Sequence, residues 1–383
     1  MHSRLRAVFV SILFPFIFCG LVCMRVAFDG DRTTTMSPPD LSLQTILEES
    51  HTEAITALEF SPDGKFLASG GDDGAIFVFS TSSWVPVKRY LDVSPVSVLV
   101  WDCRRRYLLL SGHQSGDVHV MTMDRSMVCF SRQQVKREYS RGGEQECTIQ
   151  TSRFGGCIHS MSLSPRSPRI AIGHGNEIAL MTTISGPNRL GDDRELLPKP
   201  QSSPYGPAKS AGPIAKSLHF MEKKNQLVVT YAGHGIVYVL PLFSGGVLTR
   251  SVSIWDLHTM KAASQIAPRT FPMYVHMTIA YPRSTFTKIS GKSIVARDDD
   301  IITVSNLVNG VDWYSLSDHT FLSTTKFPAG GELLPSSTLT YTEDGAAVIV
   351  GGTHGSAHIL GRDKGVQILD HGGMSVQLFS SLP

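Results

Sequence analysis

Short apolar segments alternate with polar turns along most of this chain. The clearest example lies at 56–80, where TALEFSPDGKFLASGGDDGAIFVFS contains three apolar segments separated by two glycine-containing turns. Asp63-Gly64 between two apolar segments is a strong hairpin signal, because glycine accepts a positive φ at no steric cost. The pattern predicts strands at 55–60, 66–69 and 75–79, followed by a fourth at 85–91.

This arrangement of strands and turns is repeated along the chain. Residues 337–361 (STLTYTEDGAAVIVGGTHGSAHILG) match 56–80 without a gap, so that both glycine turns fall in register. More degenerate copies begin near 95, 157, 213 and 293. A period of about 40 residues built from short strands indicates a repeat architecture, since one repeat cannot bury its apolar face alone. Four antiparallel strands in about 40 residues are typical of one propeller blade.

The first repeat carries a family resemblance. The segment HTEAITALEFSPDGKFLASGGDDGAIFVFS, which starts at His51, resembles a WD40 repeat in its histidine, its SPDG turn, its second glycine turn and its apolar third strand. The usual Trp-Asp end of that strand is replaced by Phe79-Ser80, and the nearest match to it is Trp255-Asp256. The resemblance implies an all-β fold, a WD40-type β-propeller over 43–383 with six recognisable blades.

The two ends of the repeat region predict how the ring closes. Residues 376–379 supply only the first strand of a seventh repeat, and 43–47 fit a final strand. In WD40 propellers the first and last segments commonly share one blade. We therefore expect an incomplete seventh blade without its two central strands, which leaves costly unpaired edges, or a chain truncated relative to a seven-bladed family.

Residues 1–35 form a separate apolar N-terminal segment. Residues 7–24 carry no charge, and their length lies between the core of a signal peptide and a full membrane span. Three interpretations stay open: an uncleaved membrane anchor, a cleaved signal, and a non-native extension ahead of Met36. No good small-x-small cleavage site follows, so an anchor is more plausible than a cleaved signal.

Long connectors interrupt the repeats. Removing 236–250 restores the fourth repeat, which predicts either a loop inserted at the rim or a retained intervening sequence. Residues 185–213 are rich in Pro, Gly and Ser, and we expect a surface loop there. The connectors lie at 134–155, 185–213, 236–250 and 265–292.

Composition narrows the function and the compartment. The net charge of +2 gives no indication of nucleic-acid binding by bulk charge. The six cysteines show no CxxC pair, and no Asn-x-Ser/Thr sequon occurs, which favours the cytosolic side. We expect a cytoplasmic protein, or a membrane-anchored one whose propeller faces the cytosol; secretion is the less favoured alternative.

Few residues point to chemistry. Histidine recurs in the turn between second and third strands, and we expect these side chains to be exposed and too dispersed to share a metal ion. Asp298-Asp299-Asp300 and Arg104-Arg105-Arg106 fit solvated turns, and Cys157 with His159 fits a core pair. No nucleophile elbow or phosphate-binding loop is present, so no catalytic residue, metal or cofactor is predicted. The recurring histidines are His113, His174, His234 and His354.

The resemblance implies a non-enzymatic scaffold for protein–protein interaction. Its binding face carries the loop entering each blade and the loop between the second and third strands. We expect protein or peptide partners, no nucleic acid, and a possible membrane tether through 7–24. The alternative is a secreted or membrane-attached propeller enzyme of the hydrolase class. The candidate partner-binding residues are Glu53, Asp73, His113, Ser115, His174, His234, Asn309 and His354.

Overall fold

The structure is a computed structural model of the whole chain. It describes residues 6–13, 19–27, 40–105, 107–122, 150–184, 189–199, 213–221, 225–238, 246–266, 274–275, 293–295, 301–305, 310–326, 339–341, 347–351, 356–362, 366–370 and 375–378.

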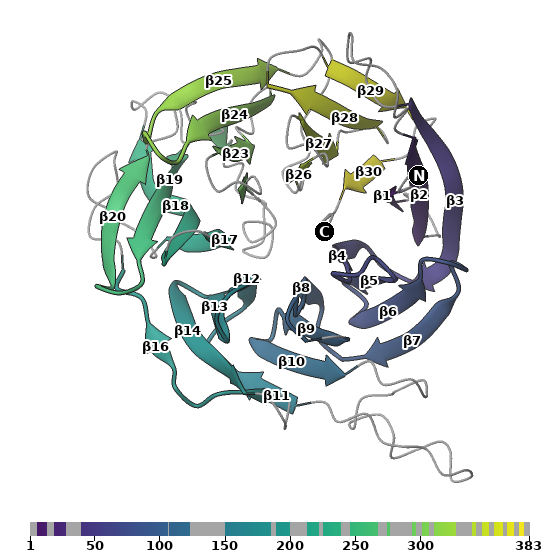
Figure 1. Ribbon diagram of the computed structural model, residues 1–383, viewed down its shortest axis with the longest axis horizontal. Helices are drawn as coiled ribbons and strands as arrows, with labels where there is room; N and C mark the ends of the chain where they lie inside the picture. Colours follow the sequence, from purple (N-terminus) through teal and green to yellow (C-terminus); the bar gives the residue numbers. More distant parts are fainter. Residues whose placement is uncertain are drawn as a thin grey trace.

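The described strands form seven antiparallel sheets, arranged as blades around a ring (Figure 1). Blade 1 contains β4 (Ile55–Phe60), β5 (Phe66–Gly71), β6 (Ala75–Ser80) and β7 (Pro86–Leu91). Blade 2 contains β8 (Val96–Trp101), β9 (Leu108–His113), β10 (Asp117–Thr122) and β11 (Gln150–Arg153). Blade 3 contains β12 (Ile158–Leu163), β13 (Arg169–His174), β14 (Glu177–Ile184) and β15 (Arg189–Leu190), with β16 (Glu195–Leu196) also paired with β14.

The remaining blades follow the same plan. Blade 4 contains β17 (Ile214–Phe220), β18 (Gln226–Tyr238), β19 (Gly246–Asp256) and β20 (Lys261–Ile266), with β21 (Tyr274–Val275) paired with β19. Blade 5 contains β22 (Ser293–Val295), β23 (Ile301–Ser305), β24 (Gly310–Ser315) and β25 (Phe321–Lys326). Blade 6 contains β26 (Leu339–Tyr341), β27 (Ala347–Gly351), β28 (Ser356–Gly361) and β29 (Val366–Asp370). The closing blade contains β30 (Ser375–Leu378), β1 (Arg6–Leu13), β2 (Cys19–Ala27) and β3 (Asp40–His51).

Blade 1 follows the sequence pattern closely. The strands predicted at 55–60, 66–69, 75–79 and 85–91 correspond to β4 to β7. Gly64 and Gly74 take positive φ values of 68° and 73° in the two turns, as the glycine signals predicted. The prediction of an all-β propeller is confirmed.

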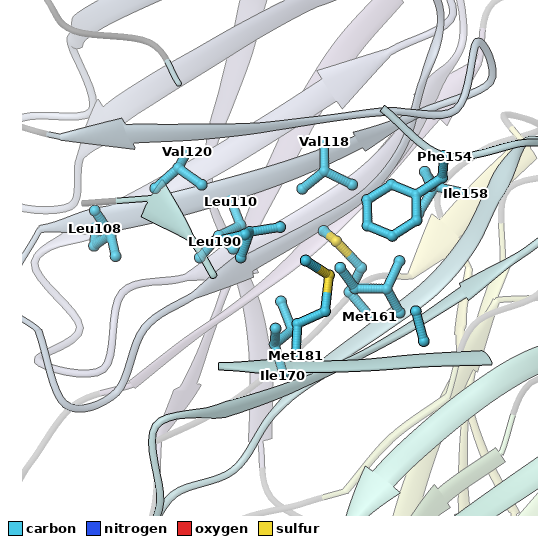
Figure 2. Packing of buried hydrophobic residues seen from close by; sticks show 12 residues of the cluster. Leu108, Leu110, Val118, Val120, Phe154, Ile158, Met161, Ile170, Met181 and Leu190 are labelled. Carbon is cyan, nitrogen blue, oxygen red and sulfur yellow. The ribbon is translucent and has the colours of Figure 1, made fainter. Parts of the chain in front are cut away.

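Neighbouring blades bury apolar side chains against one another. Figure 2 shows one such layer, in which side chains of blade 2 meet those of blade 3. Val118 and Ile158 are fully buried there, and Met161 and Met181 fill the space between the sheets. A polar contact also joins blades: Trp101 Nε1 donates to the carbonyl oxygen of Glu59 at 3.0 Å. Interblade packing therefore holds the loops of consecutive blades at fixed positions.

The closing blade corrects an expectation. It has four strands in the order β3-β2-β1-β30, and its two central strands come from the apolar N-terminal segment. That segment therefore supplies the strands that the repeat pattern left missing. The physical reason is that a short continuous apolar segment can form a strand as well as a membrane segment, and composition alone does not separate the two. The described residues include no helix with the length and apolar character that a membrane crossing requires.

The insertion in blade 4 continues its hairpin. Beyond a register shift after Ala232, Ile236 pairs with Leu248 and Tyr238 pairs with Gly246. The described part of 236–250 therefore extends β18 and β19 instead of forming a separate loop. Most of the connectors 134–155, 185–213 and 265–292 lies outside the described residues, as does Asp298-Asp299-Asp300.

Candidate functional site

Backbone hydrogen bonds join the predicted face into a continuous belt across blades 1 to 3. In each of these blades the turn between second and third strands bonds to the loop that enters the blade: Asp72 N donates to Ala54 O, Gln114 N to Pro95 O, and Gly175 N to Cys157 O. The turns of blades 1 and 2 also bond to the loop entering the next blade, since Asp92 N donates to Gly74 O and Phe154 N to Gly116 O. The loops that the resemblance assigned to partner binding therefore lie side by side.

A buried histidine organises this belt in blade 1. His51, whose side chain has 0% exposure, donates through Nδ1 to Asp73 Oδ1 at 3.1 Å, and Ser69 Oγ donates to its Nε2 at 2.8 Å. Asp73 also accepts from the backbone amides of Thr52 and Ala75 at 2.9 and 3.0 Å. Burial raises the pKa of Asp73, but these donors outweigh it and hold that pKa below its usual value. The carboxylate therefore fixes the turn against the incoming loop.

Blade 2 contains a different network at the same positions. His113 Nδ1 donates to the carbonyl oxygen of Ser94 at 3.1 Å, and Ser111 Oγ donates to His113 Nε2 at 2.9 Å. His119 Nε2 donates to Asp92 Oδ2 at 2.6 Å. Burial and the neighbouring His119 lower the pKa of His113 to about 4, whereas the hydrogen bond from His119 holds the pKa of Asp92 at about 2. His113 is therefore a neutral imidazole at pH 7.

In blade 3 aromatic contacts occupy these positions. The ring of Phe154 lies 5.0 Å from the ring of His174, and the Arg194 guanidinium lies over Phe154 at 4.2 Å from the ring centre. Burial lowers the pKa of His174 and, with Lys216 nearby, lowers the pKa of His159 to about 4. In blade 3, ring packing therefore joins the turn to the entry loop, where blades 1 and 2 use side-chain hydrogen bonds.

The structure divides the predicted site residues into exposed and inward-facing groups. Glu53 and Ser115 are exposed in their loops, and Ser115 Oγ donates to Asp117 Oδ2 at 2.8 Å. Asp73 faces His51, and His113 and His174 are buried in separate blades. The expected exposure of these two histidines is therefore wrong, because each is the last strand residue before its turn and faces the entry loop of its own blade. The side chain of His234 and the residues Asn309 and His354 lie outside the described part of the chain.

Other exposed residues of the same belt were not predicted individually. Val93 is 75% exposed, which is high for an apolar side chain, and it lies in the loop that enters blade 2. Thr52, Gln114 and Asn176 are exposed in the corresponding loops and turns. The loop rule applied to every blade would have found them, since each occupies one of the two loop types already named.

The basic turn in blade 2 is an interblade contact. Arg104 Nη2 donates to Thr183 Oγ1 at 3.0 Å, and Arg105 Nη2 donates to the carbonyl oxygen of Thr183 at 2.8 Å. The carboxylate of Asp102, which is buried, lies within 3.5 Å of both guanidinium groups. This corrects the expectation of a solvated turn for Arg104 and Arg105; Arg106 is outside the described residues.

Cys157 and His159 lie at the start of β12, the inner strand of blade 3. Cys157 directly precedes the strand, and His159 is its second residue. His159 occupies a register shift between Ile158 and Ser160, and burial raises the pKa of the Cys157 thiol. A raised thiol pKa disfavours the reactive thiolate, and both side chains are half-buried.

A ring of four-stranded antiparallel blades with such a loop belt defines a β-propeller. The model of the family named WD domain, G-beta repeat matches residues 42–80. That segment, which includes β4, β5 and β6 of blade 1, is therefore similar to a WD40 repeat.

Two known proteins illustrate the likeness. Protein HIR1 of Yarrowia lipolytica is 31% identical over 91 residues, which are 22% of this chain and 9% of that protein, so the chain spans less than a tenth of this relative. The crystal structure of the Cps50 (Swd1) beta-propeller domain of Myceliophteria thermophila has a TM-score of 0.57 at 14% identity and covers 85% of this chain and 88% of that chain. The second likeness concerns the fold alone.

Proposed function

We propose that this chain is a non-enzymatic scaffold that binds a protein or peptide partner on the loop belt of blades 1 to 3. The observation that carries the proposal is the exposed set on this belt, which combines the apolar side chain of Val93 with polar side chains of the neighbouring loops and turns. An apolar centre with a polar rim is the usual composition of a protein-binding surface. The exposed polar residues of this set are Thr52, Glu53, Gln114, Ser115 and Asn176.

The belt is suited to docking because its backbone is fixed. The turns of blades 1 and 2 are each bonded on one side to their own blade's entry loop and on the other to the next blade's entry loop, and the turn of blade 3 is bonded to its own entry loop. Gly74 and Gly116 have positive φ values of 73° and 89°, which set the direction of two of these turns. A preorganised surface loses little conformational entropy on binding, so the exposed side chains need contribute less energy.

A scaffold role also accounts for the chemistry of the inward residues. The buried histidines at 51 and 113 each use both ring nitrogens in hydrogen bonds inside the belt. The raised thiol pKa of Cys157 likewise disfavours nucleophilic use. On this proposal the propeller works on the cytosolic side, an expectation that rests on the absence of CxxC pairs and of Asn-x-Ser/Thr sequons in the sequence.

Peptides selected from a display library against the full chain provide the test. Val93→Arg should weaken binding of the selected peptides at least about tenfold, because a buried apolar contact is worth roughly 1.4 kcal/mol or more. The matched control is Val85→Arg, since Val85 is 56% exposed just before the outer strand β7. Equal binding by Val93→Arg and the unmodified chain, or an equal loss in Val85→Arg, would overturn the proposal.

A further inference from the structure

We propose that Asp92, His113 and His119 form a binding site for a divalent transition-metal ion of the zinc class. The three residues come from separate segments: Asp92 follows β7, His113 ends β9, and His119 lies in β10. One ligand atom from each lies within 4.8 Å of the others. Two imidazoles and one carboxylate are a donor set that zinc and its neighbours accept, whereas magnesium and calcium prefer oxygen alone.

The two imidazole rings lie close enough to share an ion. Their centres are 4.6 Å apart, and their planes cross at 75°. Imidazoles bound to one tetrahedral zinc ion at Zn–N distances of about 2.0–2.1 Å have ring centres about 5 Å apart. The ring separation therefore fits, and the donor atoms need only draw together to the roughly 3.3 Å edge of such a site.

Each histidine also has the outer hydrogen bond that metal-binding histidines usually carry. A carbonyl oxygen only accepts, so the contact with Ser94 places the proton of neutral His113 on Nδ1 and the lone pair on Nε2. In the metal-free network Ser111 Oγ donates to that lone pair at 2.9 Å, so this hydroxyl must turn away when an ion binds there. Thr151 Oγ1 lies 2.9 Å from His119 Nδ1, on the side of the ring away from Asp92. Such bonds fix the tautomer and the orientation of the ring.

The ion would take the place of the proton between Asp92 and His119. In the metal-free network His119 Nε2 donates that proton to Asp92 Oδ2 at 2.6 Å. When the ion binds Nε2, the proton moves to Nδ1 and is donated to Thr151 Oγ1. Asp92 Oδ1 remains with the backbone amides of Val93 and Ser94, so the carboxylate keeps its position while Oδ2 becomes the ligand.

The site has a route for the ion and a coordination position for water. The side chains of Asp92 and His119 are 23% and 14% exposed, whereas His113 is fully buried. An ion can therefore enter from solvent and keep a water molecule as its fourth ligand. The corresponding positions of blade 1 hold His51, Gly71 and Phe77, so the propeller fold itself does not require this donor set.

Calorimetric titration of the full-length, chelator-treated chain with Zn²⁺ tests the proposal, with Co²⁺ absorbance as a second signal. We expect one binding step per chain that is lost or weakened by at least about 100-fold in His119→Phe and in Asp92→Asn. Thr151→Val, which removes only the outer hydrogen bond, should weaken it about 10- to 100-fold. His258→Ala, a change of an exposed histidine outside the cluster, should leave it unchanged.

Thermal melts without metal separate a lost site from a lost fold. His119→Phe introduces the residue that blade 1 has at position 77, and Asp92→Asn is nearly isosteric, so at least one of them should melt like the unmodified chain. If the unmodified chain shows no such step, or if a folded His119→Phe or Asp92→Asn chain retains it, the cluster is a hydrogen-bond network only and the proposal is wrong.

Discussion

Blades 1 and 2 have the same strand pairing, yet different residues join their loops. Ile55 of blade 1 and Val96 of blade 2 each pair with the last residue of the following strand. Four residues before them, the chain has His51 in blade 1 and Asp92 in blade 2. The carboxylate of blade 2 therefore occupies the position that the histidine has in blade 1, and the two imidazoles of blade 2 occupy the positions of Gly71 and Phe77.

These differences are sterically coupled. A Cβ at Gly71 would lie 2.6 Å from Nδ1 of His51, so blade 1 has no space for a side chain there. His113 occupies the same position in blade 2, where Asp92 in place of the histidine leaves that space free. The comparison shows that the propeller requires the loops to be joined but does not fix which side chains join them.

The largest expected effect concerns the joint between the two networks, at Gly74. A Cβ there would overlap the carbonyl oxygen of Asp92, and its φ of 73° is unfavourable for other residues. Gly74→Ala should therefore lower the free energy of unfolding by about 3 kcal/mol or more, from backbone strain together with overpacking. Urea unfolding at equilibrium measures this loss.

Gly64→Ala is the matched control. Gly64 has a similar φ of 68°, but a Cβ added there meets no atom within 4 Å. Gly64→Ala should lower the free energy of unfolding by only about 1 kcal/mol, the strain of the left-handed backbone. If both variants lost the same stability, the close approach of Gly74 to the Asp92 carbonyl would contribute nothing beyond backbone strain, and the joint between the two blades would tolerate a side chain.

The next largest effect is expected at His51. His51→Ala removes the donor to Asp73 and the acceptor for Ser69, and it leaves a cavity in a fully buried position. We expect a loss of about 2–3 kcal/mol in the free energy of unfolding. The same change at exposed His258 serves as the control. A loss below about 0.5 kcal/mol at His51 would show that the blade 1 network is dispensable.

A smaller, pH-dependent effect is expected at Asp73. Its pKa is lower in the folded chain than the unfolded value of 3.8, so its stabilising contribution is present above that pH and is lost as the pH falls through the folded pKa. Asp73→Asn should cost about 1 kcal/mol at neutral pH, and the gap to the unmodified chain should close below pH 3.8. Denaturant unfolding across this range measures it, with Glu53→Gln as an exposed control. If the difference in the free energy of unfolding between the two chains persisted unchanged in acid, the loss would come from the altered side-chain geometry and not from the carboxylate charge.

The sequence predicted the repeat and the loop types because both depend on local signals. Asp63-Gly64 and Gly74 specify turns by their own backbone geometry. Glu53 and Ser115 were placed on the binding face because they lie in the two loop types that the resemblance assigns to it. The orientation of His113 was missed because a turn position does not say whether the preceding strand residue faces solvent or the entry loop of its own blade. Asp92 and His119 are 27 residues apart, and only the registers of β7 to β10 bring them together.

The smallest expected effect on stability tests the comparison most directly, by rebuilding blade 1 in blade 2. Asp92→His, His113→Gly, Ser115→Asp and His119→Phe together place the blade 1 residues at the corresponding positions. If the two networks are interchangeable, the fourfold variant should unfold within about 1 kcal/mol of the unmodified chain, although the metal-binding step should be lost. His113→Gly alone should cost more, because it leaves Ser94 and Ser111 without their buried partner. A fourfold variant less stable than His113→Gly would show that blade 2 depends on its own donors, and that the exchange between the blades also requires residues beyond these four positions.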